Sequence, residues 1–447
     1  MVKFTSAALC AALAVASASA HMSPVRRQAA TSTFTGTLAP SVSSIVATIK
    51  SGEGNPTATQ PLYSTASPGA KNPQITNAPA LPDAKQITIA NFPPLDALPP
   101  TDSPQVQAWI KEIDWSKVPS VPSTVDAASC SGNPNNLKAA GADGNCWWTC
   151  GGCTRDTDIT TCPTKNTWGL SYDDGPSPYT PQLLEYLNEH QLKSTFFVVG
   201  SRVLSRPEML QLEYSAGHQI SVHTWSHPSL TMLTNEQIVA ELGWTREVIR
   251  QTIGVSPNTM RPPYGDIDDR VRAISNQMGL TPIIWTSAPG GGNYDTNDWK
   301  IGAGTVSAAE VVSTFEGILK NAPNLDTGYI VLAHDLYQQS VELATEVVLP
   351  FAQSMNPKQN LMPIIQCLNK PAGDAYVETN RNITGSQATA TASGSAAVKS
   401  GSSGSNGAAG AQSTSKSASG SSSGAAASLQ APLVLLGCTL LGAALLF

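Results

Sequence analysis

The sequence contains little charge. Only 13% of its 447 residues are Asp, Glu, Lys or Arg, and the formal net charge is −6. A protein that binds nucleic acid through its phosphates normally carries a basic surface, so this composition argues against a nucleic-acid partner. The pattern His-Glu-x-x-His is also absent, which argues against a zinc peptidase of the common helical type.

Long apolar runs are absent except at the two ends. Residues 1–20 combine Lys3, an apolar run and the small residues Ala18-Ser19-Ala20. This combination is typical of a cleaved secretory signal, and the run is too short to span a membrane. We therefore expect a secreted chain that begins near His21.

The other end carries an uncharged apolar tail, residues 429–447, after a stalk rich in Ser, Gly and Ala at 371–428. The tail has no charged flank, which favours a glycosylphosphatidylinositol (GPI) anchor signal over a transmembrane helix. Small residues at the candidate attachment site are Ser419, Gly420 and Ser421. The expected location is the outer face of the plasma membrane and the cell wall, and a freely secreted form is the alternative.

Cysteine usage agrees with export. Of the eight cysteines, six remain once Cys10 leaves with the signal and Cys438 with the tail. An even number in an oxidising compartment predicts disulfides, although six cysteines allow 15 pairings and the sequence assigns none. The spacing Cys146-x3-Cys150-x2-Cys153 also resembles a zinc knuckle, but no His lies nearby, so a disulfide-stapled loop is favoured. Asn382-Ile383-Thr384 is a glycosylation acceptor, which fits the same compartment.

Composition divides the chain after the signal into an arm, a Cys-rich lead-in and a catalytic domain. The catalytic domain alternates between short apolar runs and helix-length amphipathic stretches. Residues 21–125 are rich in Ser, Thr, Pro and Ala, which predicts a disordered low-complexity arm, partly wrapped on the core near its end. A Cys-rich lead-in (126–164) and a catalytic domain (165–370) follow. The predicted strands are 167–172, 194–199, 220–223, 259–261, 282–286, 329–333 and 362–365, and the predicted helices are 181–190, 207–216, 235–253, 269–278, 308–319 and 341–355.

Repeated strand-then-helix units predict an α/β fold with a mainly parallel sheet. About seven such units favour closure into a distorted (β/α)7-type barrel. In such barrels the reacting groups gather at the C-terminal ends of the strands. Polar clusters follow five of the predicted strands or the loops after them.

Two of these clusters supply candidate metal ligands. Asp173 and Asp174 end the first strand before Gly-Pro, where a solvated turn is the alternative. His223 and His227 follow the third strand, and two His four residues apart project in the same direction on one helical turn. Two His and a carboxylate form a three-ligand site with room for water and substrate, as hydrolytic metal centres require.

The remaining clusters carry an arginine, acids beside a tryptophan, and a histidine. Arg261 precedes two prolines and is suited to clamp a carboxylate; a surface arginine before a turn is the alternative. Asp298 and Trp299 suit a sugar-binding wall or a capped helix start. His334 ends a buried strand, where a lone His would more often belong to the core.

In this order, the segments SYDDGP, HTWSHP, RPPYG, DTNDW and LAH resemble the five motifs of the polysaccharide deacetylase (NodB-like) esterases. The resemblance covers roughly residues 160–370, and the stalk and tail make the sequence most similar to the fungal chitin deacetylases of that family. One departure is Tyr172, where the family's first motif often has Phe.

The resemblance implies a divalent metal, Zn²⁺ or Co²⁺, held by Asp174, His223 and His227. It implies that Asp173 is the general base paired with Arg261, and that His334 is the general acid oriented by Asp298. The backbone N–H of Tyr264 would bind the oxyanion, while Leu332 and Trp299 would enclose the acetyl methyl group.

The implied reaction is hydrolysis of the N-acetyl groups of chitin, which yields chitosan and acetate in a fungal wall. The implied partners are the N-acetylglucosamine polymer, the membrane through the GPI anchor, and cell-wall glucan. Alternatives are a family member that acts on xylan or peptidoglycan, and a non-catalytic wall mannoprotein that only binds glycan. The implied metal ligands, general base and general acid are all present, which argues against the last alternative. They are Asp174, His223, His227, Asp173 and His334.

Overall fold

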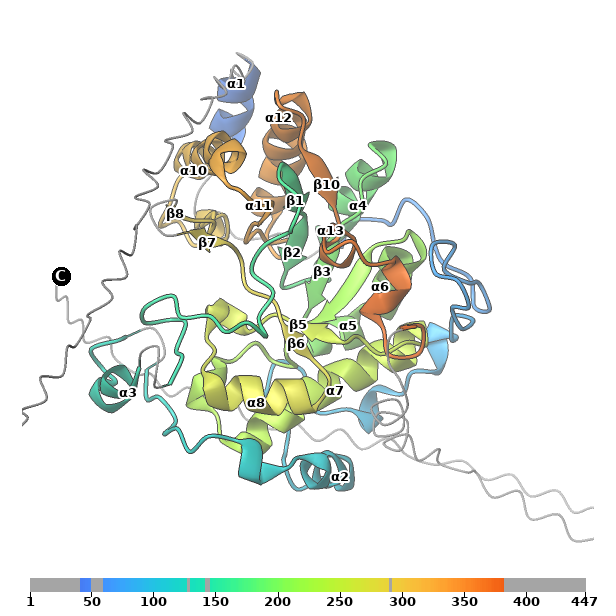
Figure 1. Ribbon diagram of the computed structural model, residues 1–447. Helices are drawn as coiled ribbons and strands as arrows, with labels where there is room; N and C mark the ends of the chain where they lie inside the picture. Colours follow the sequence, from blue (N-terminus) through green and yellow to red (C-terminus); the bar gives the residue numbers. More distant parts are fainter. Residues whose placement is uncertain (1–40, 50–58, 127–128, 141–144, 289–291, 382–447) are drawn as a thin grey trace, which may run out of the picture. The chain divides into compact units, whose positions relative to one another are not determined.

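The computed structural model describes residues 41–49, 59–126, 129–140, 145–288 and 292–381 (Figure 1). They all belong to one of the two units into which the chain divides, Met1–Ala396. The predicted signal sequence, the glycosylation acceptor Asn382, the stalk beyond residue 381 and the apolar tail lie outside the described residues.

A five-stranded parallel sheet forms one side of the barrel. Its order is β2-β3-β4-β5-β6, and every neighbouring pair is parallel. The bounds are β2 Ser171–Asp173, β3 Thr195–Val198, β4 Gln219–Val222, β5 Thr259–Met260 and β6 Thr281–Pro282. Strands β2 to β5 are buried along their whole length, as expected for a parallel sheet that helices cover.

A second parallel sheet, β10-β1-β9, continues the ring. Its strands are β1 Thr167–Gly169, β9 Tyr329–Ile330 and β10 Asn360–Met362. Because β1 runs into β2 after Leu170, one strand belongs to both sheets. On the far side, the N–H of Thr286, just beyond β6, donates to the carbonyl of Ile330 in β9 (3.0 Å). The predicted α/β fold is confirmed, and its barrel is distorted because these contacts replace a continuous ladder.

Helices follow the strands, and capping residues explain several of their ends. The bounds are α4 Thr180–Glu189, α5 Gly200–Ser205, α6 Pro207–Ser215, α7 Asn235–Ile253, α8 Asp269–Gln277, α10 Ala308–Asn321, α11 Gln338–Leu343 and α12 Leu349–Ser354. Helix α7 begins with a capping box between Thr234 and Gln237 and ends at Gly254, whose φ is 80°. A π-helical turn, Ala344–Val348, links α11 to α12.

Shorter elements complete the described residues: α1 Ser41–Thr48, α2 Pro104–Glu112, α3 Pro134–Ala139, α9 Trp299–Gly302, α13 Ile364–Cys367 and the hairpin β7 Ser287–Ala288 with β8 Gly292–Asn293. The last predicted strand, 362–365, is wrong for its second half. Strand β10 ends at Met362, and Pro363 then caps helix α13. Proline cannot continue a ladder of hydrogen bonds, and it is accepted at the start of a helix.

The predicted disordered arm, which was expected to pack on the core only near its end, is instead packed on the barrel over residues 59–125. Ile75, Leu81, Phe92 and Trp109 are all buried in the hydrophobic core, and α2 lies against α7 (Figure 1). Gly243 of α7 has no room for a Cβ because the ring of Trp109 occupies that space. Single apolar side chains inserted from an extended chain leave no helical or strand periodicity, so the sequence pattern does not show this packing.

The globular part also extends past the predicted boundary at residue 370. Tyr376 is buried, and its hydroxyl oxygen accepts a hydrogen bond from the N–H of Ile220 in β4 (3.0 Å). The N–H of Val377 donates to the carbonyl of Ser256 (2.9 Å). Residues 371–381 therefore belong to the domain rather than to the stalk.

Three disulfides join the six remaining cysteines: Cys130–Cys150, Cys146–Cys153 and Cys162–Cys367. The first two staple the lead-in, which confirms the predicted loop and not a zinc knuckle. The third ties the segment before β1 to α13, across 205 residues. In the part of the chain that the structure describes, no helix is long and apolar enough to cross a membrane.

Candidate active site

A cavity of about 640 Å³ lies at the C-terminal ends of the strands. Asp173 is the last residue of β2, His223 follows β4, and His334 comes four residues after β9. Because the strands are parallel, their ends bring these distant residues to one edge of the barrel. The cavity is lined by eight of the predicted catalytic, substrate-binding and metal-ligating residues: Asp173, Asp174, His223, His227, Tyr264, Trp299, Leu332 and His334.

Asp174, His223 and His227 form a candidate metal centre. One ligand atom from each lies within 4.8 Å of the others. Asp174 Oδ1 lies 3.3 Å from His223 Nε2 and 3.0 Å from His227 Nε2, yet it has no hydrogen-bond partner among the described residues. A buried carboxylate oxygen without a donor, facing two imidazole nitrogens, fits a divalent cation.

The two histidines reach this geometry from a loop, so the expected helical turn is wrong. Residues 223–227 have no helical structure, and Thr224 and His227 have φ angles of 66° and 61°. Asp174 also has a positive φ, 78°. Such left-handed conformations are strained for residues other than glycine, and they persist where surrounding contacts hold them.

Glu241 of α7 supplies some of those contacts. Its carboxylate accepts hydrogen bonds from the backbone N–H groups of Trp225 (2.7 Å) and Ser226 (2.9 Å) and from the Ser226 hydroxyl (2.6 Å). Phe92 of the packed N-terminal segment stacks on Trp225, with ring centroids 6.1 Å apart. The loop between the two histidines is therefore held by hydrogen bonds to α7 and by packing against the N-terminal segment.

Asp173 is held by Arg261. Arg261 Nη1 lies 2.7 Å from Asp173 Oδ1, and both side chains are buried. The same nitrogen donates to the Ser171 hydroxyl (3.1 Å), and the guanidinium lies 4.0 Å from the centre of the Phe197 ring. Arg261 thus orients Asp173, and the second carboxylate oxygen faces the candidate metal centre, 3.9 Å from His223 Nε2.

His334 forms the second acid–base pair, with Asp298. Nδ1 of His334 lies 2.7 Å from Asp298 Oδ1, and the backbone N–H of His334 donates to Asp298 Oδ2 (2.8 Å). Burial by itself would lower the pKa of His334, but the charge and hydrogen bond of Asp298 outweigh it and raise the pKa to about 10. At neutral pH the ring is therefore an imidazolium with Nε2 available as a proton donor.

The three predicted substrate-binding residues, Tyr264, Leu332 and Trp299, all line the cavity. Tyr264 has φ 60° and its ring meets that of His227 edge-on, 4.7 Å between centroids. Leu332 is buried, and it forms an isolated parallel β-bridge with Asp295. Trp299 begins α9 directly after Asp298, whose carboxylate caps that helix.

Other residues of the site were not assigned a role from the sequence. Asp335 accepts a hydrogen bond from the Thr180 hydroxyl, and its carboxylate occupies the space next to Gly175; burial raises its pKa to about 7. Arg202 donates to the backbone carbonyl of Asp174 (2.6 Å). Trp148 lines the cavity from the Cys-rich lead-in, where two adjacent tryptophans between cysteines were the available signal.

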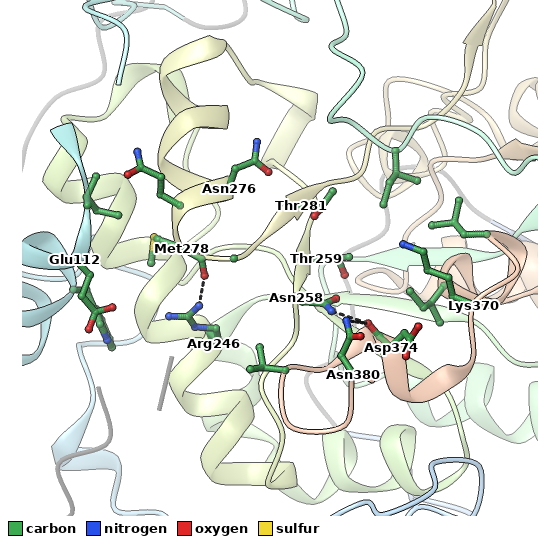
Figure 2. Close-up of a pocket in the computed structure, with 18 residues that line it drawn as sticks. Glu112, Arg246, Asn258, Thr259, Asn276, Met278, Thr281, Lys370, Asp374 and Asn380 are labelled. Atoms are coloured by element: carbon green, nitrogen blue, oxygen red, sulfur yellow. Dashed lines mark hydrogen bonds between the residues drawn. The ribbon is translucent and has the colours of Figure 1, made fainter. Parts of the chain in front are cut away.

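Figure 2 shows a slightly larger cavity, of about 690 Å³, whose lining residues place it at the opposite end of the barrel. It is lined by Asn258, Thr259 and Thr281, at the starts of β5 and β6. Arg246 there donates to the carbonyl of Met278, as Figure 2 shows. Among the described residues, the only cluster of three metal-ligating side chains is the one that contains Asp174. The candidate metal centre therefore lies at the smaller cavity.

Comparisons with known proteins show which family this chain resembles. The family model for polysaccharide deacetylase matches residues 160–283. Chitin deacetylase 1 of Cryptococcus neoformans var. grubii is 58% identical over 356 residues, which are 78% of this chain and 74% of the relative. Chitin deacetylase of Amylomyces rouxii is 37% identical over 63% of this chain and 66% of its own length.

A solved structure, that of the chitin deacetylase from Colletotrichum lindemuthianum, aligns with a TM-score of 0.44 and 25% identity, over 49% of this chain and 94% of that one. The sequence relatives carry the assignment, since the Cryptococcus protein is matched over about three quarters of its length. The chain belongs to the polysaccharide deacetylase family.

Proposed function

We propose that this protein is a metal-dependent deacetylase that hydrolyses the N-acetyl groups of N-acetylglucosamine units in chitin. The observation that carries the proposal is the convergence of three metal-ligating side chains and two acid–base pairs on one cavity. The two relatives described above are both named chitin deacetylases, which supports chitin over other acylated polymers.

Asp174, His223 and His227 would hold the metal, for which we propose Zn²⁺ or Co²⁺. Burial raises the pKa of Asp174, but His227 and His223 outweigh it and bring the pKa well below its ordinary value, so the carboxylate is charged. When bound, the ion supplies a Lewis acid that polarises the acetyl carbonyl and lowers the pKa of water. The His-His-carboxylate set leaves coordination positions open for those ligands.

The side chains of this protein divide the proton transfers. Asp173, aimed by Arg261, accepts the proton of the attacking water. The backbone N–H of Tyr264 would stabilise the negative charge that develops on the carbonyl oxygen. His334, protonated because of Asp298, gives its proton to the departing amine. Leu332 and Trp299 enclose the methyl group of the acetyl group.

The test is acetate release from N-acetylglucosamine oligomers by the purified protein. We expect turnover that a chelator abolishes and that added zinc or cobalt restores. Acetylated xylan and peptidoglycan, assayed side by side, separate chitin from its competitors. No acetate from any polymer, with glycan still bound, would favour a binding protein instead; turnover that a chelator leaves intact would remove the metal from the mechanism.

We further propose that the protein is exported, glycosylated at Asn382 and GPI-anchored near Ser419, Gly420 or Ser421. In the cell wall it would contact chitin and glucan. Its three disulfides support export, because such bonds persist in oxidising compartments. A phosphatidylinositol-specific lipase should release the protein from membranes. A protein that stays in the membrane fraction after this treatment would contradict the anchor.

A further inference from the structure

Part of the catalytic cavity is built by a segment that precedes the deacetylase domain. Trp148, Thr149 and Gly152 line the same cavity as His223 and His334. The family model matches residues 160–283, so these three residues lie outside it. We call residues 146–153 the stapled segment.

Two disulfides limit the freedom of the stapled segment. Cys146–Cys153 joins its two ends, and Cys130–Cys150 ties its middle to the chain before α3. Eight residues closed by one covalent bond and crossed by another have few conformations available. The shape of this part of the cavity is therefore set before any substrate arrives.

Asp266, two residues after Tyr264, attaches the stapled segment to the barrel. Its Oδ1 accepts hydrogen bonds from Trp147 Nε1 (3.1 Å) and the Thr149 hydroxyl (2.7 Å). Its Oδ2 accepts from the backbone N–H (3.0 Å) and the hydroxyl (2.6 Å) of Thr231. One buried carboxylate with four donors thus joins the stapled segment to the loop after His227 and to the segment of Tyr264.

A second set of charges holds the ends of the stapled segment. Arg272 of α8 donates to the carbonyls of Cys146 and Cys153, and its guanidinium pairs with Asp158 at 2.9 Å. The N–H of Cys146 donates to Asp269 Oδ2 (2.9 Å). These contacts fix both ends of the stapled segment to helix α8.

Trp148 fills the space directly beside Tyr264. The backbone N–H of Trp148 donates to the carbonyl of Ile267 (3.0 Å), and its ring meets that of Trp285 edge-on, with 4.6 Å between the ring centroids. Gly265 has φ 69°, and a Cβ there would lie 2.5 Å from Trp148 Cζ3. The ring is therefore fixed between Trp285 and the turn that carries the Tyr264 N–H.

A cavity of about 640 Å³ is much larger than an acetyl group, so most of it must serve the rest of the substrate. A sugar ring offers an apolar C–H face and polar hydroxyl edges. Trp148 supplies a rigid apolar surface, and Thr149 and Asn293 place polar groups on the same cavity.

We propose that the stapled segment is a substrate-binding wall, and that Trp148 contacts the sugar unit next to the one that loses its acetyl group. This proposal rests on the proposed function and deepens it, because it makes the preferred substrate an oligomer or polymer instead of a single sugar. Trp148 acts on affinity for the chain, separately from the proton transfers by Asp173 and His334.

The test compares two substrates. The kcat/KM for a hexamer of N-acetylglucosamine is divided by that for 4-nitrophenyl acetate, which carries the acetyl group without a sugar chain. We expect Trp148→Ala to lower this ratio about tenfold, mainly through KM for the hexamer, as for the loss of one well-packed aromatic contact. Trp148→Phe, which keeps an aromatic ring, should restore most of the ratio.

Trp115→Ala is the matched control, since Trp115 lies outside both cavities, and its ratio should equal that of the unmodified protein. If Trp148→Ala does not fold, Trp148→Leu keeps bulk against Gly265 without the ring and should show the same loss. An unchanged ratio, or an equal fall in kcat for both substrates, overturns the proposal. Absence of acetate release by the unmodified protein would overturn the proposed function itself.

Discussion

His218 should make the stability of this protein fall on acidification. The residue lies just before β4, at the opposite end of that strand from His223. It is 2% exposed, and its Nδ1 accepts a hydrogen bond from the N–H of Ser194 (3.1 Å). Its ring meets Phe196 edge-on at 5.2 Å, and Nε2 has no hydrogen-bond partner among the described residues. The neutral ring is therefore the form that the fold accepts.

The magnitude follows from the linkage between protonation and folding. Burial, with a smaller contribution from Lys193, lowers the pKa of His218 to about 3, whereas the unfolded chain has a value of ~6.5. As pH falls below ~6.5 the unfolded state binds a proton that the native state refuses, so stability is lost down to about pH 3. Between pH 7 and pH 5 the loss is about 2 kcal/mol, because each proton contributes ~1.4 kcal/mol per pH unit below the unfolded pKa.

His218→Asn removes the titration while Oδ1 can still accept from Ser194. Urea unfolding of both proteins at the two pH values, in the same chelator-containing buffer, gives the difference directly, because all other titrating groups are common to both. The unmodified protein should lose about 2 kcal/mol more than the variant. Equal losses in the two proteins would show that the native state protonates His218 and would refute the reasoning.

Three further predictions concern the site and the covalent frame. Asp173→Asn should lower kcat by about 10²–10⁴-fold, the usual contribution of a general base, while isothermal titration still shows zinc binding; lost binding would mean that Asp173 is a ligand. Asp298→Asn should lower the pKa of His334 from about 10, so the alkaline limb of the kcat–pH profile should move to lower pH; an unmoved limb would assign the acid to another group. Cys162→Ala with Cys367→Ala should lower the free energy of unfolding by roughly 2–5 kcal/mol, because a long loop loses its closure, and an unchanged urea midpoint would contradict this.

The predicted helices were most accurate where capping residues mark their ends. The 235–253 pattern became α7 without change, because Thr234, Gln237 and Gly254 specify its start and stop locally. The predicted helix 341–355 is instead interrupted by a π-helical turn, which depends on packing in the domain and leaves no mark in a hydrophobic pattern. The boundaries at residues 125 and 370 were wrong for a related reason: Trp109 and Tyr376 are buried by distant partners, α7 and β4.

The polar clusters of the site were recognisable because they follow predicted strands or the loops after them, and the resemblance to the polysaccharide deacetylases implied the role of each residue. What the sequence could not show is their contact geometry. The helical turn expected for His223 and His227 is a loop whose positive φ angles depend on support from Glu241 and Phe92, which both contact Trp225 in that loop. These two partners come from separate parts of the chain.

By itself, the sequence determined the α/β class, the order of the motifs and the residue types that meet at the strand ends, because these depend on local periodicity and on the parallel arrangement it implies. Tertiary structure alone decided the disulfide pairing, the packing of residues 59–126 and the position of Trp148 in the catalytic cavity. Each of these depends on contacts between residues far apart in the chain. The buried pairs Arg261–Asp173 and Arg272–Asp158 show the same dependence, because each joins residues that lie far apart in the chain.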